Sequence, residues 1–175
     1  MRYFHLQSDP LRLTGSLEQT SGPPVYRLSR GELYNAKPDM APFRFSCAGE
    51  LCDYYSGDCL MARALVETLH GAGVDNLQVF PAALTDDNTG TVREDYCVVN
   101  IVGKVAAADM RQSQAISLGG GQVFTRLAVD PGRARDLLIF RLGESLVDVI
   151  VHEKVAKAVA AGGFRAVVLS PVTAE

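Results

Sequence analysis

Residues 96–113, YCVVNIVGKVAAADMRQS, decide the fold of this chain. The first half of this stretch is an apolar, β-branched run that is interrupted by Asn100 and stopped by Gly103. An apolar run of this length that ends at a glycine is typical of a buried strand. A second strand-like piece, residues 104–107, leads into the polar residues 109–113. We therefore expect a strand in the interior of the protein, followed at once by a shorter one.

The segment before this stretch predicts a helix and then a strand. Apolar side chains recur at helical spacing in residues 59–70. Gly71 and Gly73 lie where such a helix ends. Residues 76–81 then alternate between apolar and polar side chains, as in a short strand that ends at a proline.

The same order recurs near the C-terminus. Residues 146–151 predict a strand, residues 153–161 predict a helix, and residues 166–169 predict another strand. Equivalent positions of the two segments lie 90 residues apart, as Gly73 and Gly163 do. The offset suggests two pseudo-symmetric halves around a common sheet. Chance similarity between two generic helix–glycine–strand units is the alternative.

The N-terminal third, residues 1–53, contrasts with this regular part. Its glycines and prolines divide it into short pieces, which predicts an irregular layer that wraps the core. Residues 1–6 have the alternation of an edge strand, and residues 25–28 suggest another strand. We expect a mixed α/β fold with a central mixed sheet of about six or seven strands and two or three helices. Residues 1–175 would form one domain, with residues 54–175 as its regular core.

Composition bounds the class of protein. A chain of 175 residues that is 47% hydrophobic and 21% charged is ordinary for one globular domain. No apolar run has the length of a membrane span, and the N-terminus lacks the apolar core of a signal peptide. We therefore expect a cytoplasmic protein that has no contact with a membrane. Its four cysteines would then be reduced thiols rather than a disulfide framework.

Charge is concentrated in the middle of the chain. The net charge is -3, but residues 46–95 alone hold nine acidic and two basic side chains, one of them Arg93. The sequence has no basic stripe, which argues against binding of nucleic acid by phosphate neutralisation. A basic protein partner suits this segment, and a merely solvated acidic surface is the alternative. The candidate partner-binding residues are Glu50, Asp53, Asp58, Asp86, Asp87, Glu94 and Asp95.

Several motifs resemble catalytic or ligand sites without completing them. His152 and Glu153 begin like a zinc-protease helix, but residue 156 is alanine where the second histidine belongs. The triple glycine at residues 119–121 lacks the Lys-Ser/Thr pair of a phosphate loop. Residues 86–90, DDNTG, are typical of a hairpin turn rather than a calcium loop. The spacing of Cys47, Cys52 and Cys59 does not match a zinc ribbon, so the sequence predicts no metal and no cofactor.

Four segments together resemble one known family. Motifs of the Imm11 family of immunity proteins are similar to residues 96–113, residues 73–81 (GVDNLQVFP), residues 138–155, which contain LIFRL and IVHEKV, and residues 161–167 (AGGFRAV). This family was long catalogued as a domain of unknown function. The resemblance covers residues 54–172, and its motifs are mostly turns, helix ends and buried strands. It therefore implies a fold family more directly than a chemistry.

The resemblance implies a protein that binds a cognate bacterial toxin in the cytoplasm and blocks it. Such proteins belong to polymorphic-toxin or contact-dependent systems, and they stabilise no transition state. Two other classes stay open from the residues alone. One is a small enzyme whose site assembles from distant residues such as Arg141, His152 and Glu153. The other is a regulatory module that associates with itself through a sheet edge.

Overall fold

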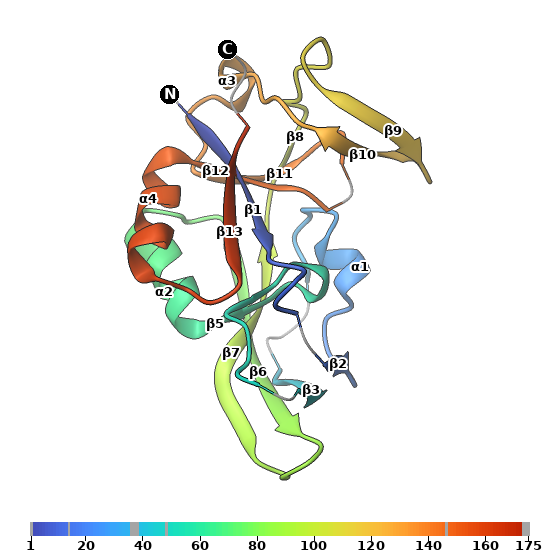
Figure 1. Ribbon diagram of the computed structural model, residues 1–175, viewed down its shortest axis with the longest axis vertical. Helices are drawn as coiled ribbons and strands as arrows, with labels where there is room; N and C mark the ends of the chain where they lie inside the picture. Colours follow the sequence, from blue (N-terminus) through green and yellow to red (C-terminus); the bar gives the residue numbers. More distant parts are fainter. Residues whose placement is uncertain (1, 14, 36–38, 48, 146, 173–175) are drawn as a thin grey trace.

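The computed structural model describes residues 2–13, 15–35, 39–47, 49–145 and 147–172. These residues form two large sheets, a small two-stranded sheet and four α-helices. The two large sheets lie one above the other along the longest axis, and helices α2 and α4 lie side by side along one flank (Figure 1). The start of β1 (Tyr3–Ser8) and the end of β13 (Val167–Pro171) lie at the same end of the molecule as the small sheet (Figure 1).

The larger sheet has six strands in the order β2-β3-β6-β7-β5-β4. Their bounds are β2 Ser16–Gln19, β3 Ala41–Ser46, β4 Tyr54–Tyr55, β5 Leu60–Ala62, β6 Leu77–Asp86 and β7 Val92–Ile101. The second sheet has five strands in the order β13-β1-β12-β11-β8. Their bounds are β1 Tyr3–Ser8, β8 Lys104–Val105, β11 Ile139–Leu142, β12 Val149–His152 and β13 Val167–Pro171.

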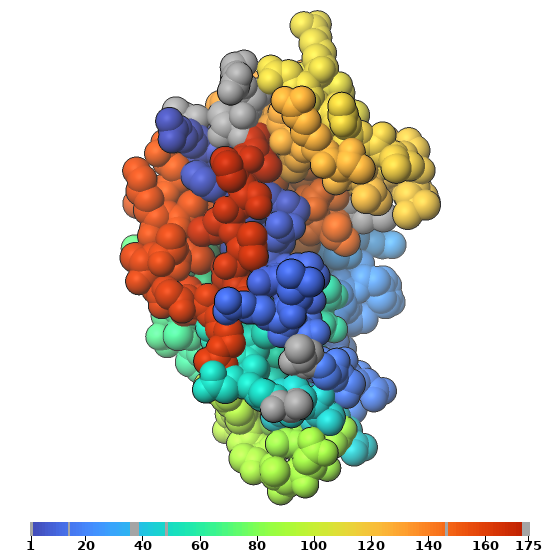
Figure 2. All heavy atoms as spheres, in the orientation of Figure 1, coloured from blue at the N-terminus to red at the C-terminus, as the bar shows by residue number. Residues whose placement is uncertain are grey.

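The remaining elements are a hairpin and the helices. Strands β9 Gln114–Leu118 and β10 Gly121–Arg126 form the small sheet, and this hairpin projects from one end of the molecule (Figure 2). The helices are α1 Val25–Leu28, α2 Arg63–Gly71, α3 Pro131–Ala134 and α4 Glu153–Gly162, with a 3-10 turn at Ser56–Asp58. None of the described helices is long and apolar enough to cross a membrane.

The stretch that decides the fold forms β7 and β8, as predicted. Its apolar run is continuous because both faces of β7 are covered. Val98 packs into a core on one face of the sheet, with Phe43 and Leu84, whereas Val99 and Ile101 pack into the core on the other. After Gly103, which has a φ of +114°, the chain leaves the six-stranded sheet and enters the five-stranded one as β8.

The two helix–strand segments are equivalent in topology. The strands before and after α2, β5 and β6, flank β7, and the strands before and after α4, β12 and β13, flank β1. Each middle strand is antiparallel to both of its neighbours. Each unit is therefore a β-α-β crossover split by one antiparallel strand. The middle strand follows its unit in one case and precedes it in the other.

The register of the strands has the same 90-residue offset as the sequence. Val98 pairs with Leu60 on one side and Phe80 on the other, and His5 pairs with Ile150 and Ser170. Leu60 and Ile150 are equivalent under the offset, as are Phe80 and Ser170. This register confirms the pseudo-symmetry, although each half has a sheet of its own rather than a share in a common one.

One core holds the two halves together. It combines α2 and α4 with the facing sides of both sheets, and its buried members include Leu65, Leu69, Val99, Val151 and Val155. A second core covers the outer face of the six-stranded sheet, and a third covers the outer face of the five-stranded sheet. Because the first core contains side chains from both sheets, neither sheet can bury its inner apolar face without the other.

The predicted fold class, a mixed α/β domain, is confirmed. The six-stranded mixed sheet corresponds to the predicted central sheet, and the five-stranded sheet adds to it. Two N-terminal predictions are wrong: β1 lies inside its sheet, between β12 and β13, rather than at an edge, and residues 25–28 form helix α1. Residues 1–53, predicted to form an irregular layer, contain the regular strands β1, β2 and β3 and the short helix α1.

Element boundaries shift by a few residues from those predicted. Helix α2 begins at Arg63 because residues 60–62 pair with β7 instead. Strand β6 continues past Pro81, and its pairing with β3 begins only at Ala82, one residue after the proline. Helix α4 matches its prediction closely, whereas Leu146, the predicted start of the strand before it, lies outside the described residues.

Candidate functional site

A groove of about 510 Å³ lies where the β6–β7 hairpin meets the segment before β4 and the end of the loop after α4. It brings together three of the seven acidic residues predicted to bind a partner: Glu50, Asp53 and Asp86. Two arginines, Arg93 and Arg165, line the same groove. Its other lining residues are Phe45, Gly49, Leu51, Thr89, Thr91 and Tyr96.

Arg165 organises one wall of the groove. Its backbone N–H donates to Asp53 Oδ2 at 2.6 Å, and its carbonyl accepts from the Asp53 N–H at 3.0 Å. Its guanidinium pairs with Glu50 and donates to the Leu51 carbonyl at 3.2 Å. Asp53 therefore fixes the backbone of the loop after α4, whereas the Glu50 side chain, although paired with Arg165, is 79% exposed and accessible to another molecule.

Arg93, on β7, also lines the groove. Its Nε and Nη2 donate to the two carboxylate oxygens of Asp95 at 3.0 and 2.5 Å, a bidentate pair. These hydrogen bonds hold the pKa of Asp95 below its ordinary value. The guanidinium also lies 5.5 Å from the centroid of the Tyr96 ring. Tyr96 is itself anchored, since its hydroxyl donates to the Cys52 carbonyl at 2.9 Å.

The turn between β6 and β7 holds Asp86 and Asp87 in different roles. Asp86 accepts hydrogen bonds from the Asn88 N–H at 2.8 Å and the Thr89 hydroxyl at 3.0 Å, and the bond from Asn88 lowers its pKa most. It therefore stabilises the predicted hairpin turn. Asp87 forms an ion pair with Arg44 of β3, with Nε and Oδ1 2.6 Å apart.

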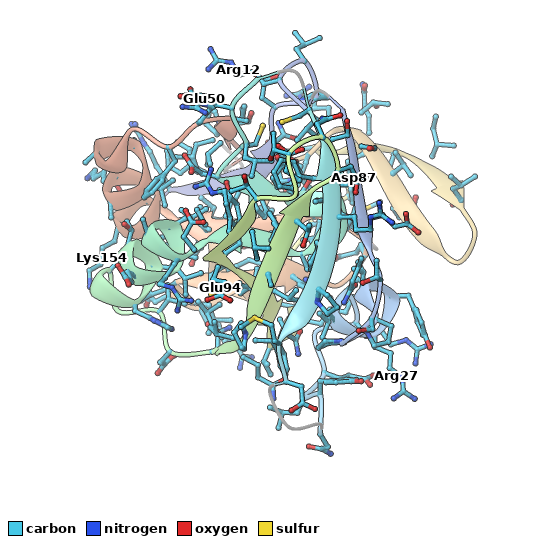
Figure 3. All side chains as sticks on the ribbon, turned by 90° about the horizontal axis from the view of Figure 1, so that it is seen from below. Arg12, Arg27, Glu50, Asp87, Glu94 and Lys154 are labelled. Carbon is cyan, nitrogen blue, oxygen red and sulfur yellow. The ribbon has the colours of Figure 1, made fainter. Side chains whose placement is uncertain are left out.

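The remaining four predicted acids, Asp58, Asp87, Glu94 and Asp95, do not line the groove. Asp58 lines a separate, smaller pocket beside Leu13 and Tyr55, where burial raises the pKa of its carboxyl group. Glu94 is exposed on β7, and its carbonyl accepts a hydrogen bond from Arg63 at 3.0 Å. Figure 3 views the molecule from the hairpin end and shows Glu50, Asp87 and Glu94 around the β6–β7 hairpin, while Lys154 lies out by the helices.

Most of the acidic charge at this end has an internal partner. Within the described part of the chain, Glu50, Asp87 and Asp95 are ion-paired, and Asp53 and Asp86 accept hydrogen bonds from backbone N–H groups. The surface is thus a patterned array of acids and arginines rather than a uniform negative patch. Sequence counting finds the acids, but it misses Arg165 because this residue is 112 positions from Asp53 in the chain.

The residues of the alternative enzyme site do not converge. Arg141 is buried and donates to Cys59 Sγ at 3.5 Å. His152 caps α4, since its Nδ1 accepts from the Lys154 N–H at 3.1 Å. Glu153 accepts from the Arg2 N–H and approaches Lys157 at 3.4 Å. Among the described residues, no group of three or more His, Cys, Asp or Glu side chains has the geometry of a metal site.

The cysteines are free thiols, and three of them, Cys52, Cys59 and Cys97, are buried. Burial raises the pKa of each of these three. They pack as small apolar side chains in the interior.

Comparison with known proteins identifies the family. The model of the Imm11 immunity protein family matches residues 11–174 of the 175 residues. A search of curated proteins finds no significant match. The family match includes the groove, all seven predicted acids and both crossover units except β1, the strand that splits the second unit. The chain therefore belongs to the Imm11 family of immunity proteins.

Proposed function

We propose that this protein binds a cognate bacterial toxin in the cytoplasm and neutralises the toxin by covering the surface that the toxin needs for its activity. The observation that carries the proposal is the family match over residues 11–174. In this role the protein acts by binding and carries out no chemical step of its own. The placement of Arg141, His152 and Glu153 in separate structural contacts supports that view over the enzyme alternative.

The groove between Arg93 and Arg165 is the proposed toxin-binding surface. Exposed carboxylates such as Glu50 are held in place there by arginines at fixed positions. A basic face of the toxin can bind to these carboxylates. Preorganised charges lose little side-chain entropy on binding, and complementary charge raises the association rate. The partner would therefore present lysines or arginines to Glu50, Asp87, Glu94 and Asp95, with acceptor groups opposite Arg93 and Arg165.

Co-expression tests the function. The protein encoded immediately beside this chain is expressed alone and together with it, and cell survival is scored before co-purification. Rescue of a toxic neighbour together with a stable complex is the expected result. A neighbour that kills cells equally well in the presence of this protein, although the protein is folded and abundant, would contradict the proposal.

A second experiment tests the surface. The test variant removes exposed charge through four substitutions, Glu50→Gln, Asp87→Asn, Glu94→Gln and Asp95→Asn. It leaves Asp53 and Asp86 unchanged, because these two carboxylates hold the backbone. We expect the association rate with the toxin to fall about tenfold and to depend less on salt. The matched control, Glu32→Gln, Asp39→Asn, Glu67→Gln, Asp75→Asn, changes net charge equally at exposed acids that are not among the seven candidate residues. Equal rates for the two variants would exclude the candidate acids as the toxin-binding surface.

A further inference from the structure

The β9–β10 hairpin has an exposed apolar face. Ile116, Leu118 and Val123 are 64%, 66% and 49% exposed. Ile116 pairs in register with Val123, and Leu118 lies two residues further along β9, so all three side chains point to the same face. The opposite face of the hairpin packs through Phe124 against the third core. A two-stranded sheet with one apolar face exposed is marginally stable by itself.

No strand in the described part of the chain pairs with the outer edge of β9. The Gln122 N–H donates to the Glu144 carbonyl at 2.8 Å, so the backbone of Gln122 points away from β9. Its partner in register is Ser117. Residues opposite each other in an antiparallel pair either exchange both hydrogen bonds or direct both groups outward, so Ser117 also presents its N–H and C=O to the outside. Ala115, two residues earlier, does the same.

The usual protections of an edge strand are missing from β9. Natural edges carry lysine, proline, a bulge or an inward charge. The sequence of β9, QAISL, contains neither charge nor proline, and the register shift of this hairpin lies at the far end of β10, between Phe124 and Arg126. An open, uncharged, apolar edge of this kind is suited to pairing with another strand.

We infer that β9 pairs with β9 of a second copy of this chain and that the protein forms a two-fold symmetric dimer through a four-stranded sheet, β10-β9-β9-β10. The axis passes beside Ile116. Ala115 then lies opposite Ser117 of the second copy, and their outward backbone groups exchange hydrogen bonds. Ile116 meets its own counterpart as the close, non-hydrogen-bonded pair. The apolar faces of the two hairpins become one continuous surface.

Charge favours a second copy over a charged partner. The only charged residue in residues 114–126 is Arg126, so this face offers no counter-charge to an acidic or basic protein. In the paired arrangement the two Arg126 side chains are about 20 Å apart by strand spacing. This separation exceeds the Debye length of about 8 Å at physiological salt, so their repulsion is screened.

The position of the hairpin is compatible with the proposed function. The β9–β10 hairpin and the β6–β7 hairpin lie at opposite ends of the molecule (Figure 1). Dimerisation through β9 therefore leaves the groove of each copy accessible and keeps the two acidic ends apart. The inference does not depend on the identity of the toxin, because it concerns a different surface.

Mass measurement across a concentration series tests the dimer. We expect the purified protein to pass from monomer to dimer with a dissociation constant on the order of micromolar, because one strand pair buries a small area. Ile116→Lys places two like charges at the axis and should weaken association at least tenfold. The control Val92→Lys makes the same change at an exposed apolar residue at the other end of the molecule.

Crosslinking provides a test that does not depend on affinity. Ile116→Cys in a Cys47→Ser background should form a disulfide-linked dimer on mild oxidation, since the Cα atoms of such a pair lie about 4.5 Å apart. Val123→Cys, on the outer strand, should form no disulfide-linked dimer, because the two cysteines would be separated by three strand spacings. A wild-type protein that is monomeric at every concentration, or a dimer that survives Ile116→Lys unchanged, would overturn the inference. Protection from the toxin is scored separately and is expected to persist in Ile116→Lys.

Discussion

Single residues at the junction of the two sheets show how burial selects side chains. Asn100, which interrupts the apolar run of β7, is fully buried. Its Nδ2 donates to the Glu32 carbonyl at 2.7 Å and to Gln78 Oε1 at 2.8 Å. Gln78 Oε1 also accepts from the Tyr34 N–H at 2.8 Å. The two amides thus fasten the loop at residues 32–34 to the six-stranded sheet, a role that only the fold reveals.

Arg141 is a buried cation without a carboxylate partner among the described residues. It is 5% exposed, its Nε makes no hydrogen bond in the structure, and its Nη2 donates to a thiol. A buried charge with such weak compensation adds little to stability. We expect Arg141→Met either to leave the free energy of unfolding within about 1 kcal/mol of the wild-type value or to raise this free energy.

Arg141→Ala is the matched variant, because it removes the packed aliphatic stem as well as the charge. It should lower the free energy of unfolding by about 2–4 kcal/mol, measured by urea denaturation. If the methionine variant is destabilised as much as the alanine variant, the guanidinium itself stabilises the fold and this account of Arg141 is wrong.

Asp148 predicts part of the acid sensitivity of the protein. Burial raises its pKa, but hydrogen bonds from Ser145 and from His5, at 3.1 Å, outweigh burial and hold the pKa below its ordinary value. A carboxyl group with a depressed pKa stabilises the fold above its unfolded pKa of about 3.9, and this stabilisation is lost as pH falls through the folded pKa.

Asp148→Asn should therefore lower the free energy of unfolding by about 1 kcal/mol at pH 7. As the pH falls below about 4, the variant should lose less stability than the wild type. Urea unfolding at a series of pH values measures both effects. Parallel stability curves for the wild type and the variant would show that this carboxylate is not linked to folding.

At the scale of elements, the ends of α2 and α4 respond to alanine in opposite ways. Gly163 caps α4 in the left-handed region, with a φ of +63°, and nothing lies within 4 Å of a Cβ added there. Gly163→Ala should therefore lower the free energy of unfolding by about 1 kcal/mol through backbone strain alone.

Gly71, the last residue of α2, also has open space around it but does not have a positive φ. Gly71→Ala should raise the free energy of unfolding by about 0.4–1 kcal/mol, because the unfolded chain loses freedom. Thermal unfolding of both variants checks the pair. A shift of the melting temperature in the same direction for both would contradict the conformational argument.

For the whole molecule, the core shared by α2 and α4 predicts cooperative unfolding. Because this core includes side chains from both sheets, the sheets should unfold in one transition. Leu69→Ala, at a fully buried site on α2, should destabilise the protein by about 2–4 kcal/mol and still give one transition. Coincident far-ultraviolet and near-ultraviolet circular dichroism curves test this. Two separated transitions would mean that the halves are independent.

The sequence by itself determined what depends on local pattern. Helix α4 and its glycine end, the hairpin turn at Asp86, the buried run of β7 and the 90-residue offset are recognisable because periodicity, turn residues and burial act over short distances. Motifs at short spacing also carried the family resemblance. The acids of residues 46–95 could be counted, but their partners could not.

Only the tertiary structure decided which distant residues meet. Strand β1 lies inside a sheet because β12 and β13, more than 140 residues later in the chain, form both of its neighbours. Arg165 enters the groove because the loop after α4 turns back onto Asp53. Whether a strand is central or at an edge, and whether a carboxylate is free or paired, depends on packing between elements that one-dimensional patterns do not contain.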